Sequence, residues 1–188
     1  MNSNFKIALI DYGSGNIRSI KNALLHIGDF HVSVTSDLDI IDKSDCIILP
    51  GVGAFPDAIK NLKAKNLVEH LTDQVLVKKK PLLGICLGMQ LLFESSAEGG
   101  RNEGLGWIPG TVEYMEVKDC YRVPHVGWND LHLGRPSTMF ETLHEDKNFY
   151  FVHSYHAVCP SEYVIASFEY GQEFTAAVQF QNVVGMQF

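Results

Sequence analysis

The chain has 188 residues, 46% of them hydrophobic, and a formal net charge of −7. This acidic balance argues against nucleic acid or an anionic membrane as the main partner. No apolar run approaches the roughly 20 residues that a membrane-spanning helix needs. A chain of this size and apolar content can bury a substantial core, so we expect a single domain over residues 1–188.

The N-terminal residues and the cysteines both indicate a cytoplasmic protein. Residues 1–6 lead directly into an apolar stretch and lack the charged and apolar zones of a signal peptide. The four cysteines, at positions 46, 86, 120 and 159, are widely spaced and form no C-x-x-C pair. Reduced thiols fit this pattern better than a disulfide framework.

The first half of the chain alternates apolar runs of strand length with segments of helical periodicity. The sequence predicts strands over residues 5–11, 31–35, 46–49 and 82–85. It predicts helices over residues 15–27, 56–65, 67–79 and 87–93. Asn66 is expected to cap the helix over 67–79, with Glu69 as its capping-box partner. Such alternation predicts a mostly parallel central sheet with helices on both faces.

The second half contains few helical patterns. Strands are predicted over residues 107–117, 122–133, 149–158, 163–169, 174–180 and 183–188. They should add antiparallel members to the same sheet or form a second small sheet. The predicted fold class is therefore α/β, with a mostly parallel central sheet, flanking helices and added antiparallel strands in the C-terminal half.

The strongest functional signal is the segment Gly84-Ile85-Cys86-Leu87-Gly88, which joins a predicted strand to a predicted helix. Gly-x-Cys-x-Gly at such a turn is the thiol form of a nucleophile elbow, where flanking glycines relieve steric crowding. The N-terminus of the helix is expected to favour thiolate over thiol. Cys86 is therefore the candidate nucleophile, and the other three cysteines lack this setting.

Two glycine-rich turns follow other predicted strands. Pro50-Gly51-Val52-Gly53 should lie at the same sheet edge as Cys86, where a backbone N–H can help to form an oxyanion hole. An ordinary strand-to-helix turn is the alternative. Asp11-Tyr12-Gly13-Ser14-Gly15-Asn16 resembles a dinucleotide-binding loop only weakly, because Arg18 replaces its third glycine. A tight turn at the sheet edge and a partner-contact loop are the other interpretations of this segment.

The histidines give no metal signal. His153 and His156 form an H-x-x-H pair, but on one strand they would point to opposite faces. No Glu or Cys stands near them at ligand spacing, so no metal site is expected. His125 lies in the segment Pro124-His125-Val126-Gly127-Trp128-Asn129, whose aromatic and glycine-rich context suggests a functional surface.

Together these segments resemble the class I, or triad-type, glutamine amidotransferases, and the resemblance covers essentially the whole chain. The cysteine elbow alone indicates only the superfamily. The segment His-Val-Gly-Trp-Asn at 125–129, combined with Phe-Val-His-Ser-Tyr at 151–155, points more narrowly to the glutaminase subunits of imidazole glycerol phosphate synthases.

The resemblance implies a reaction and the residues that perform it. Cys86 would attack the side-chain amide of glutamine, forming a γ-glutamyl thioester and releasing ammonia, and water would then yield glutamate. The residues that would bind the oxyanion or the substrate are Gly51, Val52, Leu87, Gln90, Ser154 and Tyr155. An ordinary residue on a helix surface is the alternative for Gln90. No cofactor is implied.

The resemblance also implies a partner. In the family, ammonia passes to a (β/α)-barrel synthase subunit that makes imidazole glycerol phosphate and AICAR in histidine biosynthesis. The positions that match partner-facing segments of the family are Tyr12, Asn16, Trp128 and Asn129. Two alternatives stay open: the same glutaminase chemistry serving a sugar-aminating synthase, and a non-catalytic scaffold subunit.

The sequence departs from the family at one point. The family's base and its orienting acid lie in a His-Pro-Glu segment directly after a Gly-Val-Gln-Phe-like stretch, whereas this sequence ends with Val-Val-Gly-Met-Gln-Phe at 183–188. We expect a truncated chain rather than a subunit that has lost its triad, because everything upstream is intact. A thiol nucleophile needs a base, so the 188-residue chain itself is predicted to lack glutaminase activity.

Overall fold

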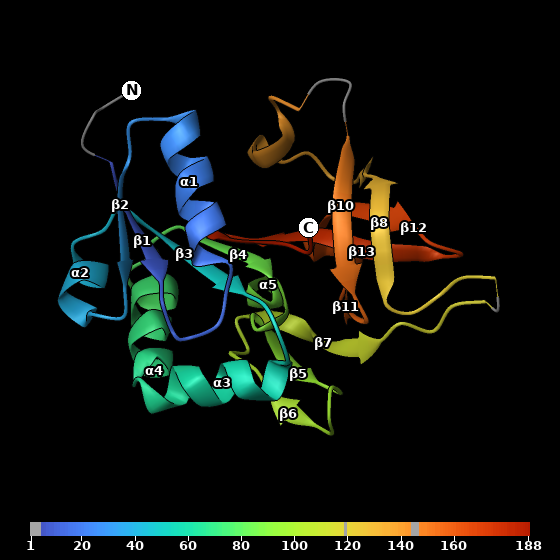
Figure 1. Ribbon diagram of the computed structural model, residues 1–188, viewed down its shortest axis with the longest axis horizontal. Coiled ribbons are helices and arrows are strands. Elements are labelled where there is room, and N and C mark those ends of the chain that lie inside the picture. The colour runs from blue at the N-terminus through green and yellow to red at the C-terminus, as the bar shows by residue number, and fades with distance from the viewer. Residues whose placement is uncertain (1–4, 119, 144–146) are drawn as a thin grey trace.

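The computed structural model describes residues 5–118, 120–143 and 147–188 (Figure 1). In this part of the chain the largest sheet has eight strands, in the order β2-β1-β3-β4-β14-β13-β12-β9. Its parallel strands are β1 (Lys6–Ile10), β2 (His31–Thr35), β3 (Cys46–Gly51), β4 (Leu82–Cys86) and β14 (Val183–Met186). The antiparallel strands are β13 (Glu173–Phe180), β12 (Val164–Glu169) and β9 (His132–Leu133). The predicted fold class is confirmed.

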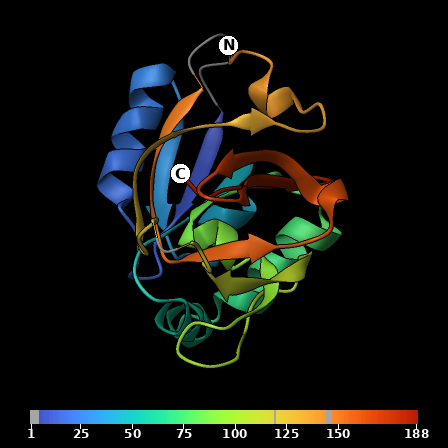
Figure 2. The same cartoon turned by 90° about the vertical axis from the view of Figure 1, so that its right-hand side faces the viewer.

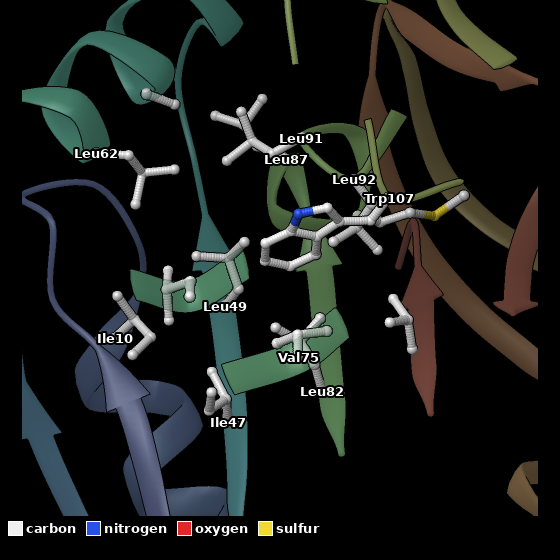
Figure 3. Close-up of a cluster of buried hydrophobic side chains, with 14 of the residues drawn as sticks. Ile10, Ile47, Leu49, Leu62, Val75, Leu82, Leu87, Leu91, Leu92 and Trp107 are labelled. Atoms are coloured by element: carbon white, nitrogen blue, oxygen red, sulfur yellow. The ribbon is translucent and has the colours of Figure 1, made fainter. Parts of the chain in front are cut away.

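Helices cover both faces of the parallel half of this sheet (Figure 1). They are α1 (Ile17–Ile27), α2 (Leu38–Asp42), α3 (Phe55–Ala64), α4 (Leu67–Thr72), α5 (Leu87–Gln90) and a π-helix at Asp73–Val77. Successive side chains of a strand point to opposite faces. Ile7 and Leu9 of β1 accordingly pack in a cluster with α1, whereas Ala8 and Ile10 join the larger cluster with α3 and α4. Figure 3 shows this larger cluster, in which Leu62 of α3 lies over the sheet.

Two smaller sheets lie beside the antiparallel half, as Figures 1 and 2 show. One pairs β10 (Asn148–His153) with β8 (His125–Asp130). The other contains β11 (Tyr155–Val158), β7 (Ile108–Tyr114), β5 (Phe93–Ser96) and β6 (Asn102–Glu103). The second half of the chain therefore both extends the main sheet and builds small sheets of its own.

The structure divides several segments that the sequence predicted as single elements. The predicted strand over 122–133 becomes β8 and β9, which lie in different sheets. The predicted strand over 149–158 breaks at Ser154, where the chain passes from β10 in one sheet to β11 in another. His153 and His156 are thus on different strands. The predicted helix over 87–93 ends at Gln90, because from Phe93 the backbone pairs with β7 as strand β5.

The predicted capping box at Asn66 is wrong. Asn66 has φ 55° and ψ 32°, and its side chain makes no capping hydrogen bond. Asparagine tolerates this left-handed conformation, which turns the chain sharply between α3 and α4. The predicted helix over 67–79 is α-helical only in its first half, since its second half is a π-helix.

Candidate active site

Cys86 lies at the last position of β4, directly before α5, on a strained backbone. Its φ of 55° and ψ of −114° are unusual for a residue with a side chain. The flanking glycines are sterically required. A Cβ at Gly84 would lie 2.8 Å from the carbonyl oxygen of Gly88, and a Cβ at Gly88 would lie 1.9 Å from the carbonyl oxygen of Leu49. The expected nucleophile elbow is thus present in the structure.

Cys86 opens into a cavity of about 360 Å³, within the size range of small-molecule sites. The structure brings together here five of the residues expected to bind the oxyanion or the substrate, namely Val52, Leu87, Gln90, Ser154 and Tyr155. Gly51 does not line the cavity. Gly51 is buried, and its close contacts with Tyr12 and the elbow leave no space for a side chain.

Four residues that the sequence did not single out as ligand-binding also line this cavity: Gly53, Glu98, Val152 and His153. Glu98 lies in a turn after β5, and its carboxylate accepts a 2.8 Å hydrogen bond from the Phe55 N–H. It therefore adds a negative charge to the cavity wall. No sequence motif identified Glu98, because only the fold brings this turn to the start of α3.

Two hydroxyl groups hold the loop that follows β3. Tyr12 donates a 2.7 Å hydrogen bond to the carbonyl oxygen of Pro50, and Ser14 donates one to the carbonyl oxygen of Val52. The Gly51–Val52 peptide lies between these two anchored carbonyls. The side chain of Tyr12 is only 1% exposed, so it is unavailable for contact with a partner, and burial raises its pKa.

Gln90 is fixed inside the protein. Its side-chain Nε2 donates to the Tyr155 carbonyl oxygen at 3.0 Å and to Oε1 of Gln187 at 2.9 Å. Only 5% of the residue is exposed, and that part lines the cavity. The alternative of an ordinary residue on a helix surface is therefore wrong.

Burial controls the ionisation of Cys86. It raises the pKa of the thiol, and hydrogen bonds from the Leu87 N–H and the Gln187 amide only partly oppose this effect. The sequence led us to expect the thiolate to be favoured. The structure differs because α5 spans only four residues and Cys86 is half-buried in the cavity wall. To act as a nucleophile near neutral pH, Cys86 would consequently need a base.

His153 lines the same cavity but is a poor base. Burial lowers the pKa of its imidazole to about 4. Its Nδ1 donates to the Tyr155 carbonyl oxygen at 2.9 Å, and its Nε2 has no hydrogen-bond partner among the described residues. His125, expected at a functional surface, is instead 2% exposed, with its ring stacked against Phe151 and Phe168. The described ranges contain no group of three metal-ligating side chains.

The remaining residues expected to face a partner lie outside the cavity. Asn16 is exposed before α1, and Asn129 is half-buried, with its amide donating to the Glu169 carbonyl oxygen. Trp128 on β8 is 69% exposed. It is paired across the strands with Tyr150 of β10, and their rings lie 5.7 Å apart. No helix of the described residues is long and apolar enough to cross a membrane.

Comparison with known proteins identifies the family of the chain. The family model "Glutamine amidotransferase class-I" matches residues 8–188. A relative from Vibrio vulnificus, "Imidazole glycerol phosphate synthase subunit HisH 2", is 58% identical over 183 residues, which are 97% of this chain and 86% of the relative. A Campylobacter jejuni relative, "Imidazole glycerol phosphate synthase subunit HisH 1", is 43% identical, with 97% of this chain and 90% of the relative covered.

Solved structures share the fold at low sequence identity. A "glutamine amidotransferase" crystal structure has a TM-score of 0.71 at 18% identity, covering 96% of this chain and 88% of the other. The glutaminase domain of Trypanosoma brucei CTPS with bound acivicin has a TM-score of 0.64 at 16% identity, covering 97% and 84%. The chain belongs to the class I glutamine amidotransferases and, within them, to the HisH subunits of imidazole glycerol phosphate synthase.

Proposed function

We propose that the cavity hydrolyses glutamine to glutamate and ammonia. The thiolate of Cys86 adds to the side-chain amide carbon of glutamine, and the C–N bond breaks to release ammonia. Water then cleaves the γ-glutamyl thioester. The observation that carries the proposal is the strained Cys86 elbow, which opens into a cavity of about 360 Å³ that Val52 and Leu87 also line.

Backbone groups and side chains would have separate roles in this reaction. The N–H groups of Leu87 and Val52 would stabilise the tetrahedral oxyanion, a role in which loss of one donor typically costs ~10²–10³ in turnover. Gly51 supports that loop by its close packing. Gln90, Ser154 and Tyr155 would hold the amino-acid end of the substrate, and the Glu98 carboxylate would attract its ammonium group.

We propose that the ammonia serves a (β/α)-barrel synthase subunit that makes imidazole glycerol phosphate and AICAR. The names and identities of the relatives support this assignment to histidine biosynthesis. We place the reaction in the cytoplasm, as the spacing of the cysteines predicts. In this proposal residues 1–188 act as one domain.

The test supplies glutamine labelled with ¹⁵N in its side-chain amide to the assembled enzyme. Transfer of the label into the imidazole product is expected, and its release only as free ammonia would contradict the assignment.

With its synthase partner, the 188-residue chain should hydrolyse glutamine at least about 10³-fold more slowly than the Vibrio relative's subunit does with its own partner. The reason is that the pKa of Cys86 is raised and that His153, with a pKa of about 4, cannot accept its proton effectively. A coupled glutamate assay measures the difference. Rapid hydrolysis by this chain would show that another group, such as His153, serves as the base.

An apolar surface around Trp128 should bind the synthase subunit. Val126 and Val152 are 54% and 55% exposed, and they pair across β8 and β10 as Trp128 and Tyr150 do. Changing Trp128 to Ser should raise the dissociation constant for the synthase at least about tenfold, since exposed tryptophans often dominate interfaces. Leu25→Ser on α1, where the side chain is 51% exposed, is the matched control and should bind normally. Titration calorimetry measures both, and equal affinities would remove Trp128 from the interface.

Two other functions stay distinguishable by experiment. A sugar-aminating synthase as partner would leave glutamine hydrolysis intact but transfer the label to a sugar nucleotide. A scaffold subunit would support synthesis from free ammonia with no glutamine-dependent turnover, even with a family His-Pro-Glu segment added after Phe188.

A further inference from the structure

Gln187 lies beside the nucleophile because of the strand register. β14 runs parallel to β4, and Met186 is the register partner of Ile85. One residue further along both strands, Gln187 is therefore next to Cys86. The Gln187 N–H donates to the Ala176 carbonyl oxygen at 2.8 Å, which fixes its backbone against β13. The residue is only 1% exposed.

The side chain of Gln187 takes part in a chain of hydrogen bonds. The acceptor at the far end of this chain determines which group donates in each of its hydrogen bonds. The Tyr155 carbonyl oxygen can only accept, so the group of Gln90 that faces it must be Nε2. The second proton of this Nε2 points to Gln187, which must present its Oε1. A flipped Gln187 would place two donors against each other. Its own Nε2 is consequently left facing Cys86, 3.6 Å from Sγ.

We propose that Gln187 stabilises the thiolate of Cys86 by donating an N–H to its sulfur, and that the chain from Tyr155 through Gln90 keeps this donor in place. The inference deepens the proposed function, which requires the thiolate. A hydrogen bond to the charged form of an acid favours that form. Here it acts on the sulfur of a half-buried cysteine, where burial opposes it by raising the pKa of the thiol.

The same contact links the nucleophile to the substrate-binding wall. Both protons of the Gln90 amide are used inside the protein, so its Oε1 is the atom left to accept a hydrogen bond from a ligand. Gln187 therefore orients two groups that approach the same substrate from different sides: the attacking sulfur and an acceptor in the cavity.

The test measures the thiolate directly, in the 188-residue chain, by alkylation with iodoacetamide across a range of pH. The sulfur displaces iodide, and mass spectrometry of the Cys86 peptide gives the rate. Gln187→Met keeps the length of the side chain but removes the donor. We expect alkylation of Cys86 at pH 7.5 to slow by roughly three- to tenfold, with the full rate recovered at higher pH.

Two controls separate this effect from general disturbance. Cys120 is exposed and serves as the internal reference in every sample. Gln74→Met removes another buried amide, which is 1% exposed and bonded to Asp42, and should leave Cys86 labelling unchanged. If Gln187→Met does not fold, Gln187→Asn retracts the donor by one methylene and should give the same change.

The outcomes are distinct. An unchanged profile for Cys86, or a rate that is lower at every pH without recovery, would overturn the inference, because the second result indicates blocked access rather than a changed thiolate. Equal slowing in Gln74→Met would overturn it as well. Labelling needs no glutamine, so it tests Gln187 even if the chain proves to hydrolyse none.

Discussion

Replacing Cys86 by alanine should abolish glutamine-dependent synthesis by the assembled enzyme while leaving ammonia-dependent synthesis within about twofold. The glutamine-dependent rate should fall at least about 10³-fold, since no other group can form the thioester. Free ammonia bypasses this step and reaches the synthase subunit directly. Because the 188-residue chain is predicted to lack glutaminase activity, a family His-Pro-Glu segment is added after Phe188 in both wild type and variant.

A matched cysteine variant makes the result specific. Cys120→Ala removes an exposed thiol away from the elbow and should leave both activities unchanged. Parallel loss of glutamine- and ammonia-dependent synthesis in Cys86→Ala would mean that the substitution had damaged the fold or the partner interface. The nucleophile would then have to be assigned elsewhere.

The elbow could be predicted from sequence because its cause is local. Gly84 and Gly88 are needed by the backbone contacts of this one turn, and the apolar runs around it set the strands. The parallel half of the sheet could be predicted for the same reason, because β1, β3 and β4 are short, strongly apolar and separated by helical segments. Patterns of this kind need no knowledge of distant residues.

The directions of several side chains could not be predicted, because contacts with residues far along the chain determine them. Tyr12 looked like a surface residue until the Pro50 carbonyl supplied a buried acceptor for its hydroxyl. His125 likewise stacks on Phe168, a residue far along the chain. The break at Ser154 depends on two sheets that meet there, and the contact of Gln187 with Cys86 depends on the register of β14 against β4.

Gly88→Ala should destabilise the protein by about 3 kcal/mol, at the upper end of the usual cost of overpacking. The added Cβ would lie 1.9 Å from the Leu49 carbonyl oxygen and 2.9 Å from its carbonyl carbon. These are backbone atoms of a central strand and cannot move aside as a flexible side chain would. For a chain of 188 residues this corresponds to a fall in Tm of roughly 6–12 °C.

The same substitution should also disable the site in the molecules that remain folded. Relief of the clash separates β3 from the elbow, so the Val52 loop and Cys86 move apart, and a displacement near 1 Å can cost about 10²-fold in rate. Gly134→Ala is the matched control, because its Cβ would have no neighbour closer than 3.4 Å and its φ is not in the left-handed region. Calorimetry measures both variants in the 188-residue chain, and the glutamate assay measures them in subunits that carry the added His-Pro-Glu segment. Equal stability of the two would show that β3 and the elbow are not in rigid contact, and the oxyanion role of Val52 would lose its structural basis.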